Sequence, residues 1–162
     1  MEALAVRRAG PDDAGAMAAV IEAVAPEGTL GAEPPVDVDA RAHGYRELVA
    51  REDAAAWVLL ERSDVVGLLT LAPRTRGVLG LATAIVAGAR GRGGGRALVD
   101  AALAWAADTD AHKVDLEVWP DNGRAIGLYA AAGFVVEGLR DRHYRRADGT
   151  LRSSLLMARR LD

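Results

Sequence analysis

One segment constrains the fold of this chain more than any other: an apolar run, a glycine-rich loop and an amphipathic stretch follow one another without a break. The run Val78–Val86 carries no charged residue, which is typical of a strand buried on both faces of a sheet. The stretch Gly93–Ala107 has apolar residues at helical spacing. A strand buried on both faces needs cover on both sides, so the segment predicts a mixed α/β architecture.

Further elements are predicted before and after this segment. Pro73 is expected to end the strand that precedes the apolar run, because proline cannot donate to a sheet ladder. The order is β-α-α-β-β-β-α-β-α-β-β, and 162 residues fit a single domain, 1–162. The remaining predicted elements are strand Leu4–Ala9, helices Ala14–Ala25 and Asp37–Glu52, hairpin strands Ala55–Glu61 and Asp64–Leu71, strand Val114–Trp119, helix Asn122–Ala132 closed by Gly133, and strands Phe134–Leu139 and Leu151–Arg160.

Composition excludes several classes of protein. The chain carries 20 basic and 23 acidic residues, a net charge of −3, which argues against a nucleic-acid-coating protein. It has no cysteine, which excludes disulfides, thiolate zinc sites and cysteine nucleophiles, and we expect no metal site. We find no apolar stretch of membrane-spanning length and no signal-peptide pattern at the start. A cytoplasmic protein with no membrane partner is therefore expected.

The glycine-rich loop has the properties of an anion-binding cradle. The first turn of a helix leaves backbone N–H groups without internal partners, and glycines let a ligand approach them closely. Arg90 and Arg92 add positive charge. The loop lacks the lysine of a nucleotide-binding P-loop, and Arg96 stands where a dinucleotide-binding loop has its third glycine. A loop that only connects strand to helix is the alternative.

Three motifs in the right order carry a family resemblance. Arg90-x-x-Gly93-x-Gly95 after an apolar strand resembles motif A of the GNAT N-acetyltransferase superfamily. The downstream pattern is similar to the second half of that family, and the start of the chain looks like its opening strand and turn. The residues concerned are Leu116-Glu117-Val118, Asn122, Ala125, Leu128-Tyr129 and Gly133-Phe134 downstream, and Arg7-x-Ala9-x-x-Asp12 at the start.

The resemblance implies a fold and a cosubstrate. The fold is a sheet splayed at its centre, and the cosubstrate is acetyl-CoA, whose pantetheine arm bonds to strand backbone between the splayed strands. By the same resemblance its pyrophosphate lies on the glycine loop. The cofactor-binding residues implied are Thr83, Ala84 and Ile85 for the arm, and Arg90, Gly91, Arg92, Gly93, Gly94, Gly95 and Arg96 for the pyrophosphate. Asn122 is a helix N-cap by propensity, and the family motif adds a cofactor contact.

The implied chemistry is direct transfer of an acetyl group to an amine. Tyr129 matches the family tyrosine that acts as general acid toward the leaving thiolate, with packing of the helix as its alternative role. Glu117 is a candidate base, because the strand Val78–Val86 has no carboxylate. His43 and His143 have suitable pKa values, and a water chain without a dedicated base is the preferred hypothesis. A non-catalytic acyl-CoA sensor on the same fold is the alternative function.

The acceptor is expected to be a small-molecule or peptide amine. The irregular segment Glu27–Arg46 is predicted to read it, and its acidic residues Glu27, Glu33, Asp37 and Asp39 favour a cationic amine. The arginines after Leu139 are the alternative, for an anionic acceptor. The sequence leaves a homodimer open.

Overall fold

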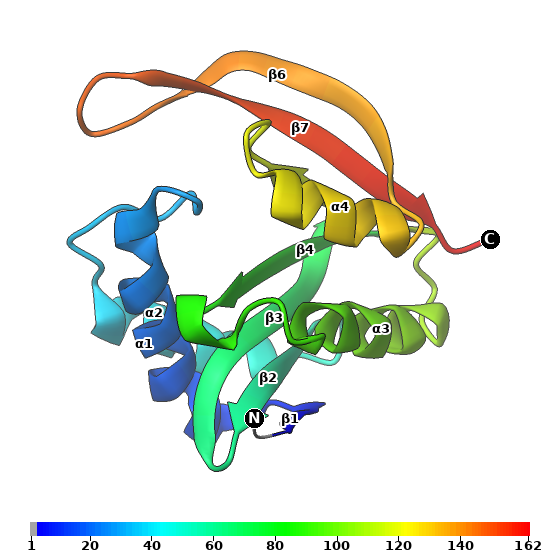
Figure 1. The fold of residues 1–162 in the computed structure, drawn as a ribbon. Coiled ribbons are helices and arrows are strands. Elements are labelled where there is room, and N and C mark those ends of the chain that lie inside the picture. The colour runs from blue at the N-terminus through cyan, green and yellow to red at the C-terminus, as the bar shows by residue number, and fades with distance from the viewer. Residues whose placement is uncertain (1–2) are drawn as a thin grey trace.

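The computed structural model describes residues 3–162, in which seven strands form one mixed sheet in the order β1-β2-β3-β4-β5-β7-β6 (Figure 1). The strands are β1 Leu4–Arg8, β2 Ala55–Glu61, β3 Asp64–Thr75, β4 Val78–Ile85, β5 Lys113–Val118, β6 Val135–Arg145 and β7 Leu151–Arg160. The helices are α1 Ala14–Val24, α2 Val38–Val49, α3 Gly94–Ala107 and α4 Gly123–Ala131, with short 3₁₀ turns Pro11–Asp13, Ala25–Glu27 and Ala87–Ala89. This order of strands and long helices confirms the predicted one.

Helices cover both faces of the central strands. Along β2, Leu59 packs in a core cluster with Leu98 of α3, whereas the next residue toward the N-terminus, Val58, packs with Met17 of α1. Neighbouring strand residues point to opposite faces, so the two helices lie on opposite sides of the sheet. Apolar residues at successive positions are therefore explained by burial on both sides. None of the helices within residues 3–162 is long and apolar enough to span a bilayer.

The sheet opens at its centre. Strands β4 and β5 run parallel, and their registered pairs extend only from Val78–Lys113 to Gly80–Asp115. Beyond that point β4 continues to Ile85 along β3, while β5 continues along β7, so the two strands separate. This geometry confirms the expected splayed sheet and leaves one edge of β4 facing open space.

Two strands extend further than the sequence predicts. Strand β3 passes through Pro73 and ends at Thr75, so the predicted end at Pro73 is wrong. Proline is tolerated there because β2 pairs with β3 only as far as Leu71, and Pro73 lies past that point with β4 as its partner. Strand β6 reaches Arg145 instead of Leu139, through an irregularity between Arg140 and Tyr144.

Candidate active site

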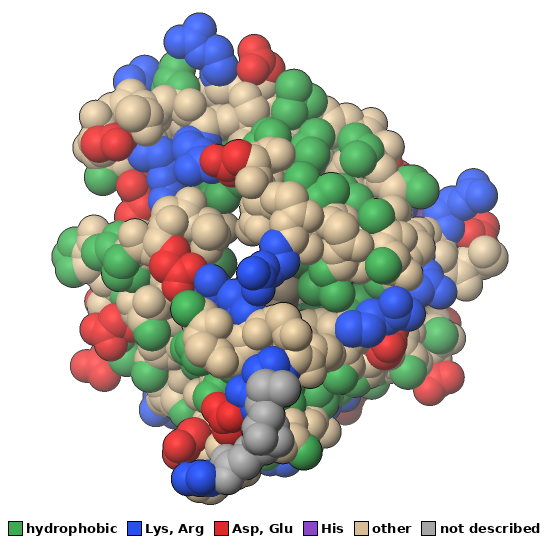
Figure 2. Space-filling view, in the orientation of Figure 1, with side chains coloured by type: hydrophobic (Ala, Val, Ile, Leu, Met, Phe, Trp, Pro, Cys, Tyr) green, Lys and Arg blue, Asp and Glu red, His purple; other side chains and the backbone are tan. Residues whose placement is uncertain are grey.

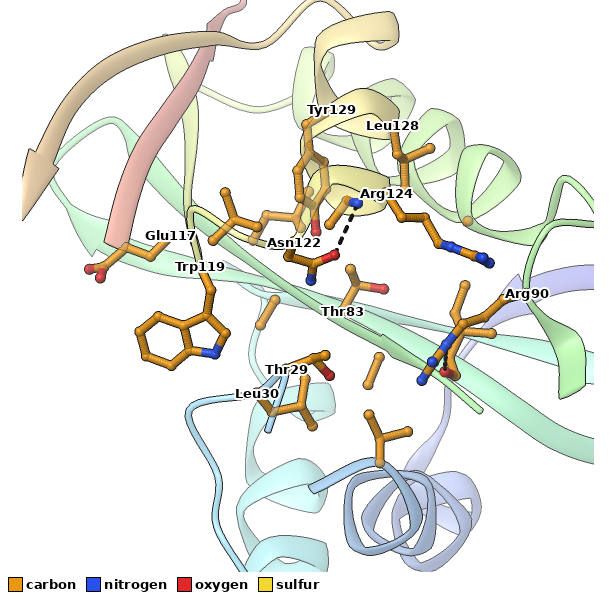
Figure 3. A pocket seen from close by; sticks show the side chains of 18 of the residues that line it. Thr29, Leu30, Thr83, Arg90, Glu117, Trp119, Asn122, Arg124, Leu128 and Tyr129 are labelled. Atoms are coloured by element: carbon orange, nitrogen blue, oxygen red, sulfur yellow. Dashed lines mark hydrogen bonds between the residues drawn. The ribbon is translucent and has the colours of Figure 1, made fainter. Parts of the chain in front are cut away.

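A cavity of about 980 Å³ occupies the space between the diverging strands. Its walls come from β4, the end of β5, the loop before α3, the inner face of α4 and the loop after α1. Figure 2 shows a hollow in this face of the molecule with basic and acidic side chains at its rim. Figure 3 shows that Arg90 and Arg124 lie at one end, Glu117 and Trp119 at the other, and Tyr129 between them.

We call the first region the arginine end. It is the part of the cavity lined by the glycine loop and by Arg90, Arg96 and Arg124. Gly91 and Gly93 adopt positive φ angles of 72° and 85°, a conformation that favours glycine, and Gly93 is the N-cap of α3. The chain therefore delivers the first-turn N–H groups of α3, which have no acceptor within the helix, to the cavity.

Gly95 exposes backbone of the first turn of α3 at the arginine end. A Cβ at this position would lie 3.1 Å from Leu128 Cδ2 and 3.4 Å from Ile85 Cδ1, so a side chain would occupy space between α3 and α4. Gly95 lines the cavity. The missing side chain thus lets Leu128 and Ile85 pack close to the start of α3 and keeps backbone of the first turn, the positive end of the helix dipole, at the cavity wall.

The arginines of this end are held to different degrees. Arg90 donates from Nε to the carbonyl of Ile85 at 2.7 Å and pairs with Glu27 at 2.7 Å. Arg96 pairs with Asp100 at 2.8 Å. Arg124, in the first turn of α4, makes no hydrogen bond or ion pair with any part of the described chain, residues 3–162. Arg124 is therefore the cation with its donors available to an anionic ligand.

Two predicted loop residues lie outside the cavity. Arg92 pairs with Glu61 at 2.7 Å, and its side chain is 14% exposed. Gly94 faces the core, where a Cβ would lie 2.5 Å from Leu59 Cδ2. Both anchor the loop and the start of α3 to the sheet, whereas Gly91 and Gly93 line the cavity.

The middle of the cavity is formed by the exposed backbone edge of β4 and by the buried hydroxyl of Tyr129. Thr83, Ala84 and Ile85 line it from β4, and the Thr83 hydroxyl donates to the carbonyl of Leu68 at 2.7 Å. Asn122 is the N-cap of α4, and its side chain accepts from the backbone N–H of Ala125 at 3.2 Å. Tyr129 is 6% exposed, and its hydroxyl points toward the cavity in Figure 3. Burial raises the pKa of Tyr129, so the hydroxyl stays protonated at neutral pH.

We call the opposite region the glutamate end: Arg74, Glu117, Trp119, Tyr144 and Ser154. The Glu117 carboxylate accepts hydrogen bonds from the Tyr144 hydroxyl at 2.6 Å and from the Ser154 hydroxyl at 2.9 Å. Partial burial by itself would raise the pKa of Glu117, but these hydrogen bonds and the charges of Arg140 and Arg74 outweigh it, so the pKa lies below its ordinary value. Glu117 is therefore a bound, ionised carboxylate.

The turn between β6 and β7 is fastened to the loop after α1. Arg146 donates to the carbonyl of Gly31 at 3.0 Å, and the backbone N–H of Ala147 donates to Glu33 at 3.0 Å. Arg152 pairs with Asp121 at 2.8 Å, and both arginines lie over the ring of Trp119, at 5.5 and 4.9 Å from its centroid. These contacts close the glutamate end on one side.

The expected acidic entrance is not formed. Glu27 is paired with Arg90, Glu33 with Arg146, and Asp37 caps α2 by accepting from Ala40 at 2.9 Å. None of these carboxylates, nor Asp39, lines the cavity. From the predicted segment Glu27–Arg46 only Thr29, Leu30 and Gly31 do so.

Several lining residues were missed from the sequence. Arg124 had a signal, because it stands in the first turn of a predicted helix beside Asn122. Arg74, Tyr144 and Ser154 had none, because each comes from a different strand and only the sheet register brings them together. The candidate bases His43 and His143 do not line the cavity.

Comparison with known proteins agrees with this geometry. Residues 19–134 match the model of the Acetyltransferase (GNAT) family. Similar solved structures include an N-acetyltransferase from Staphylococcus aureus Mu50, with 16% identity, 99% of this chain and 99% of that chain covered, and a TM-score of 0.89. A phosphinothricin acetyltransferase of the GNAT superfamily from Sinorhizobium meliloti, in complex with AcCoA, has 18% identity and a TM-score of 0.86. The match covers 97% of this chain and 88% of that chain.

A third similar structure is the ribosomal-protein-alanine N-acetyltransferase from Brucella melitensis, with 23% identity and a TM-score of 0.86. The match covers 96% of this chain and 99% of that chain. The family match extends over well more than half of the chain, and the fold agrees along nearly all of it. The chain belongs to the acetyltransferase (GNAT) family.

Proposed function

We propose that the protein moves an acetyl group from acetyl-CoA to a primary amine by direct transfer within a ternary complex. The observation that carries the proposal is the single cavity with unlike ends: backbone N–H groups and arginines at one end, a hydrogen-bonded carboxylate at the other, and the Tyr129 hydroxyl between them. Such a cavity fits a long anionic donor entering at one end and a hydrogen-bonding acceptor at the other.

The arginine end fits the pyrophosphate of acetyl-CoA. Gly91, Gly93 and Gly95 leave the helix N-terminus open, and Arg124 supplies charge that no other group in residues 3–162 neutralises. Arg90 and Arg96 add to the potential, while Arg92 and Gly94 hold the loop in place from outside the cavity. The edge of β4 at Thr83, Ala84 and Ile85, which β5 does not cover and where Arg90 already donates to the Ile85 carbonyl, offers the pantetheine amides strand-like hydrogen bonds.

The chemical step then needs little from the protein. The nitrogen of a neutral amine attacks the thioester carbonyl, the C–N bond forms, and the C–S bond breaks as the thiolate leaves. Tyr129 donates its hydroxyl hydrogen bond to that sulfur. Because burial raises the pKa of Tyr129, hydrogen-bond donation to the thiolate is favoured over complete proton transfer. The proton lost by the amine passes to water.

The acceptor is proposed only by its chemical class, a primary amine, and not by its identity. One similar structure bears the name of a phosphinothricin acetyltransferase and another that of a ribosomal-protein-alanine acetyltransferase. These names cover phosphinothricin and an alanine of a ribosomal protein. Either kind of primary amine suits the proposed chemistry.

Two measurements test the proposal. Titration calorimetry with acetyl-CoA is expected to show one site per chain, and incubation with acetyl-CoA and a panel of primary amines is expected to release free thiol. Binding without thiol release would favour the sensor function, which uses the same loop without catalysis. Absence of heat at millimolar acetyl-CoA would contradict both functions.

A further inference from the structure

Two hydroxyl groups at the glutamate end are oriented by one carboxylate oxygen. Tyr144 Oη and Ser154 Oγ both donate to Glu117 Oε2, at 2.6 and 2.9 Å, and both residues line the cavity. A hydroxyl has one proton and two lone pairs, so a hydroxyl that already donates can offer a ligand only its lone pairs. The Arg140 side chain already interacts with the Tyr144 hydroxyl, and the lone pairs that the two hydroxyls have left form a site for N–H donors.

Glu117 itself is fully occupied. Its other oxygen, Oε1, pairs with Arg140 at 3.0 Å and lies 3.8 Å from Arg74. Figure 3 shows the carboxylate directed away from Tyr129 and the middle of the cavity. A carboxylate in this position has little free capacity to take a proton from a ligand, but it holds both hydroxyl groups in place.

The charges around the two hydroxyls balance. Arg74 and Arg140 are positive, and Glu117 and Asp115 are negative, with Arg74 Nε 2.7 Å from Asp115. Such surroundings provide hydrogen bonds without a strong preference for a charged ligand. This suits an amine, which must lose its proton before it can attack a carbonyl.

The backbone of β6 is shaped to bring Tyr144 to this point. Between the pairs Arg140–Ser154 and Tyr144–Arg152, β6 has three residues where β7 has one. Within this bulge Arg142 has a φ of +46°, which is unfavourable for a non-glycine residue, and its N–H donates to Ser153 Oγ at 2.8 Å. Bulges re-aim side chains beside active sites. The Tyr144 ring is then fixed by edge contacts to Trp119 and His143.

We propose that Tyr144 and Ser154 receive the acceptor amine by accepting its N–H groups, and that Glu117 is a positioning residue that fixes both hydroxyls. The inference rests on the proposed function and names the group that orients the acceptor. Accepting the N–H groups at two oxygens leaves the nitrogen lone pair for attack on the thioester carbonyl. The amine nitrogen is thus held on the opposite side of Tyr129 from the arginine end.

A binding experiment tests this without turnover. The chain has three tyrosines, Tyr45, Tyr129 and Tyr144, so ring-¹³C tyrosine gives few signals, which phenylalanine variants assign. In the presence of CoA, titration with n-propylamine is expected to shift the Tyr144 signal saturably and leave that of Tyr45 in place. A saturable response elsewhere with Tyr144 unmoved, or no saturable response at all, would overturn the inference.

Kinetics with the best amine of the panel separates the roles. Tyr144→Phe keeps the ring and is expected to raise KM for the amine about tenfold, the cost of about one hydrogen bond, with KM for acetyl-CoA unchanged. The matched control is Tyr45→Phe, which removes a hydroxyl outside the cavity and is expected to leave both constants as they are. An unchanged amine KM in Tyr144→Phe would refute the assignment.

Two substitutions of Glu117 distinguish positioning from base catalysis. Glu117→Gln keeps a carbonyl oxygen that accepts from Tyr144, so it is expected to retain most activity, whereas Glu117→Ala should raise the amine KM as Tyr144→Phe does. A decrease in kcat by a factor of about 10² or more in Glu117→Gln would identify Glu117 as the base and overturn the positioning role. Failure of acetyl-CoA calorimetry would refute the proposed function, while the n-propylamine titration would still decide the role of Tyr144.

Discussion

The two ends of the cavity are built in opposite ways. The arginine end comes almost wholly from one continuous stretch, residues 85–96, with Arg124 added from α4. It offers a ligand mainly backbone groups. The glutamate end offers side chains from β3, β5, β6 and β7 and from Trp119 just after β5, and the β6–β7 turn beside it is fastened to the loop after α1.

In the proposed function, this difference separates recognition of the two substrates. Backbone N–H groups at a helix N-terminus bind any phosphate and place few demands on residue type beyond glycine. Side chains from several strands set a shape and a hydrogen-bond pattern, so they distinguish one acceptor from another. Substitutions at one end should therefore leave the substrate of the other end unaffected.

The largest expected effect is at the arginine end. Gly95→Asp places a carboxylate beside the helix N-terminus, between Leu128 and Ile85, and is expected to abolish detectable acetyl-CoA binding by calorimetry. Gly95→Asn is the matched control of equal size without the charge, and should weaken binding less. Circular dichroism checks that both variants fold. Wild-type affinity in folded Gly95→Asp would show that the loop is only a connector.

Tyr129→Phe tests the region between the ends. Loss of the hydroxyl is expected to lower kcat by about 10², with little change in acetyl-CoA affinity or amine KM. Because burial raises its pKa, ionisation of Tyr129 should cause no loss of wild-type activity up to about pH 10, the ordinary pKa of tyrosine. A kcat equal to that of the wild type would leave Tyr129 a packing role only.

Arg124→Gln should give the smallest effect. Removing one cation from the cavity is expected to weaken acetyl-CoA binding about tenfold and to reduce its dependence on salt, while the amine KM stays constant. Arg96→Gln provides the comparison, because Arg96 is already paired with Asp100 and should matter less. An equal loss in both variants would mean that ion pairing within the protein does not decide which arginine binds.

The sequence predicts the arginine end well for a physical reason. A buried strand, a glycine loop and a helix are contiguous, so their relation in space follows from local rules. Tyr129 and Asn122 belong to one predicted helix, and local rules predict the N-cap at Asn122, whereas the role of Tyr129 came from the family resemblance. Two things were not predicted at this end: the contribution of Arg124 from α4, and the direction of Arg92 and Gly94, which turn to the sheet because of Glu61 and Leu59.

Apart from Glu117, the glutamate end could not be predicted, because it depends on register and on irregularities. Tyr144 faces the cavity because of a bulge at Asp141–His143, and no glycine or proline in the sequence predicts that bulge. Arg74 follows a proline that sequence rules take as the end of a strand. The acidic residues near Glu33 suggested an open charged entrance, yet Glu33 itself is bound by Arg146 and Ala147, which lie more than a hundred positions away in the chain.

Strand β7, although last in the chain, lies between β5 and β6 in the sheet. On the ribosome, the glycine loop and α3 are made well before residues 151–160, which supply Ser154 and one side of the Tyr144 hairpin. In the proposed function, the donor-binding loop is thus synthesised before the strand that supplies Ser154 to the acceptor. In the proposed function, loss of β7 from its interior place in the sheet would impair amine selection, while the glycine loop lies in a separate part of the chain.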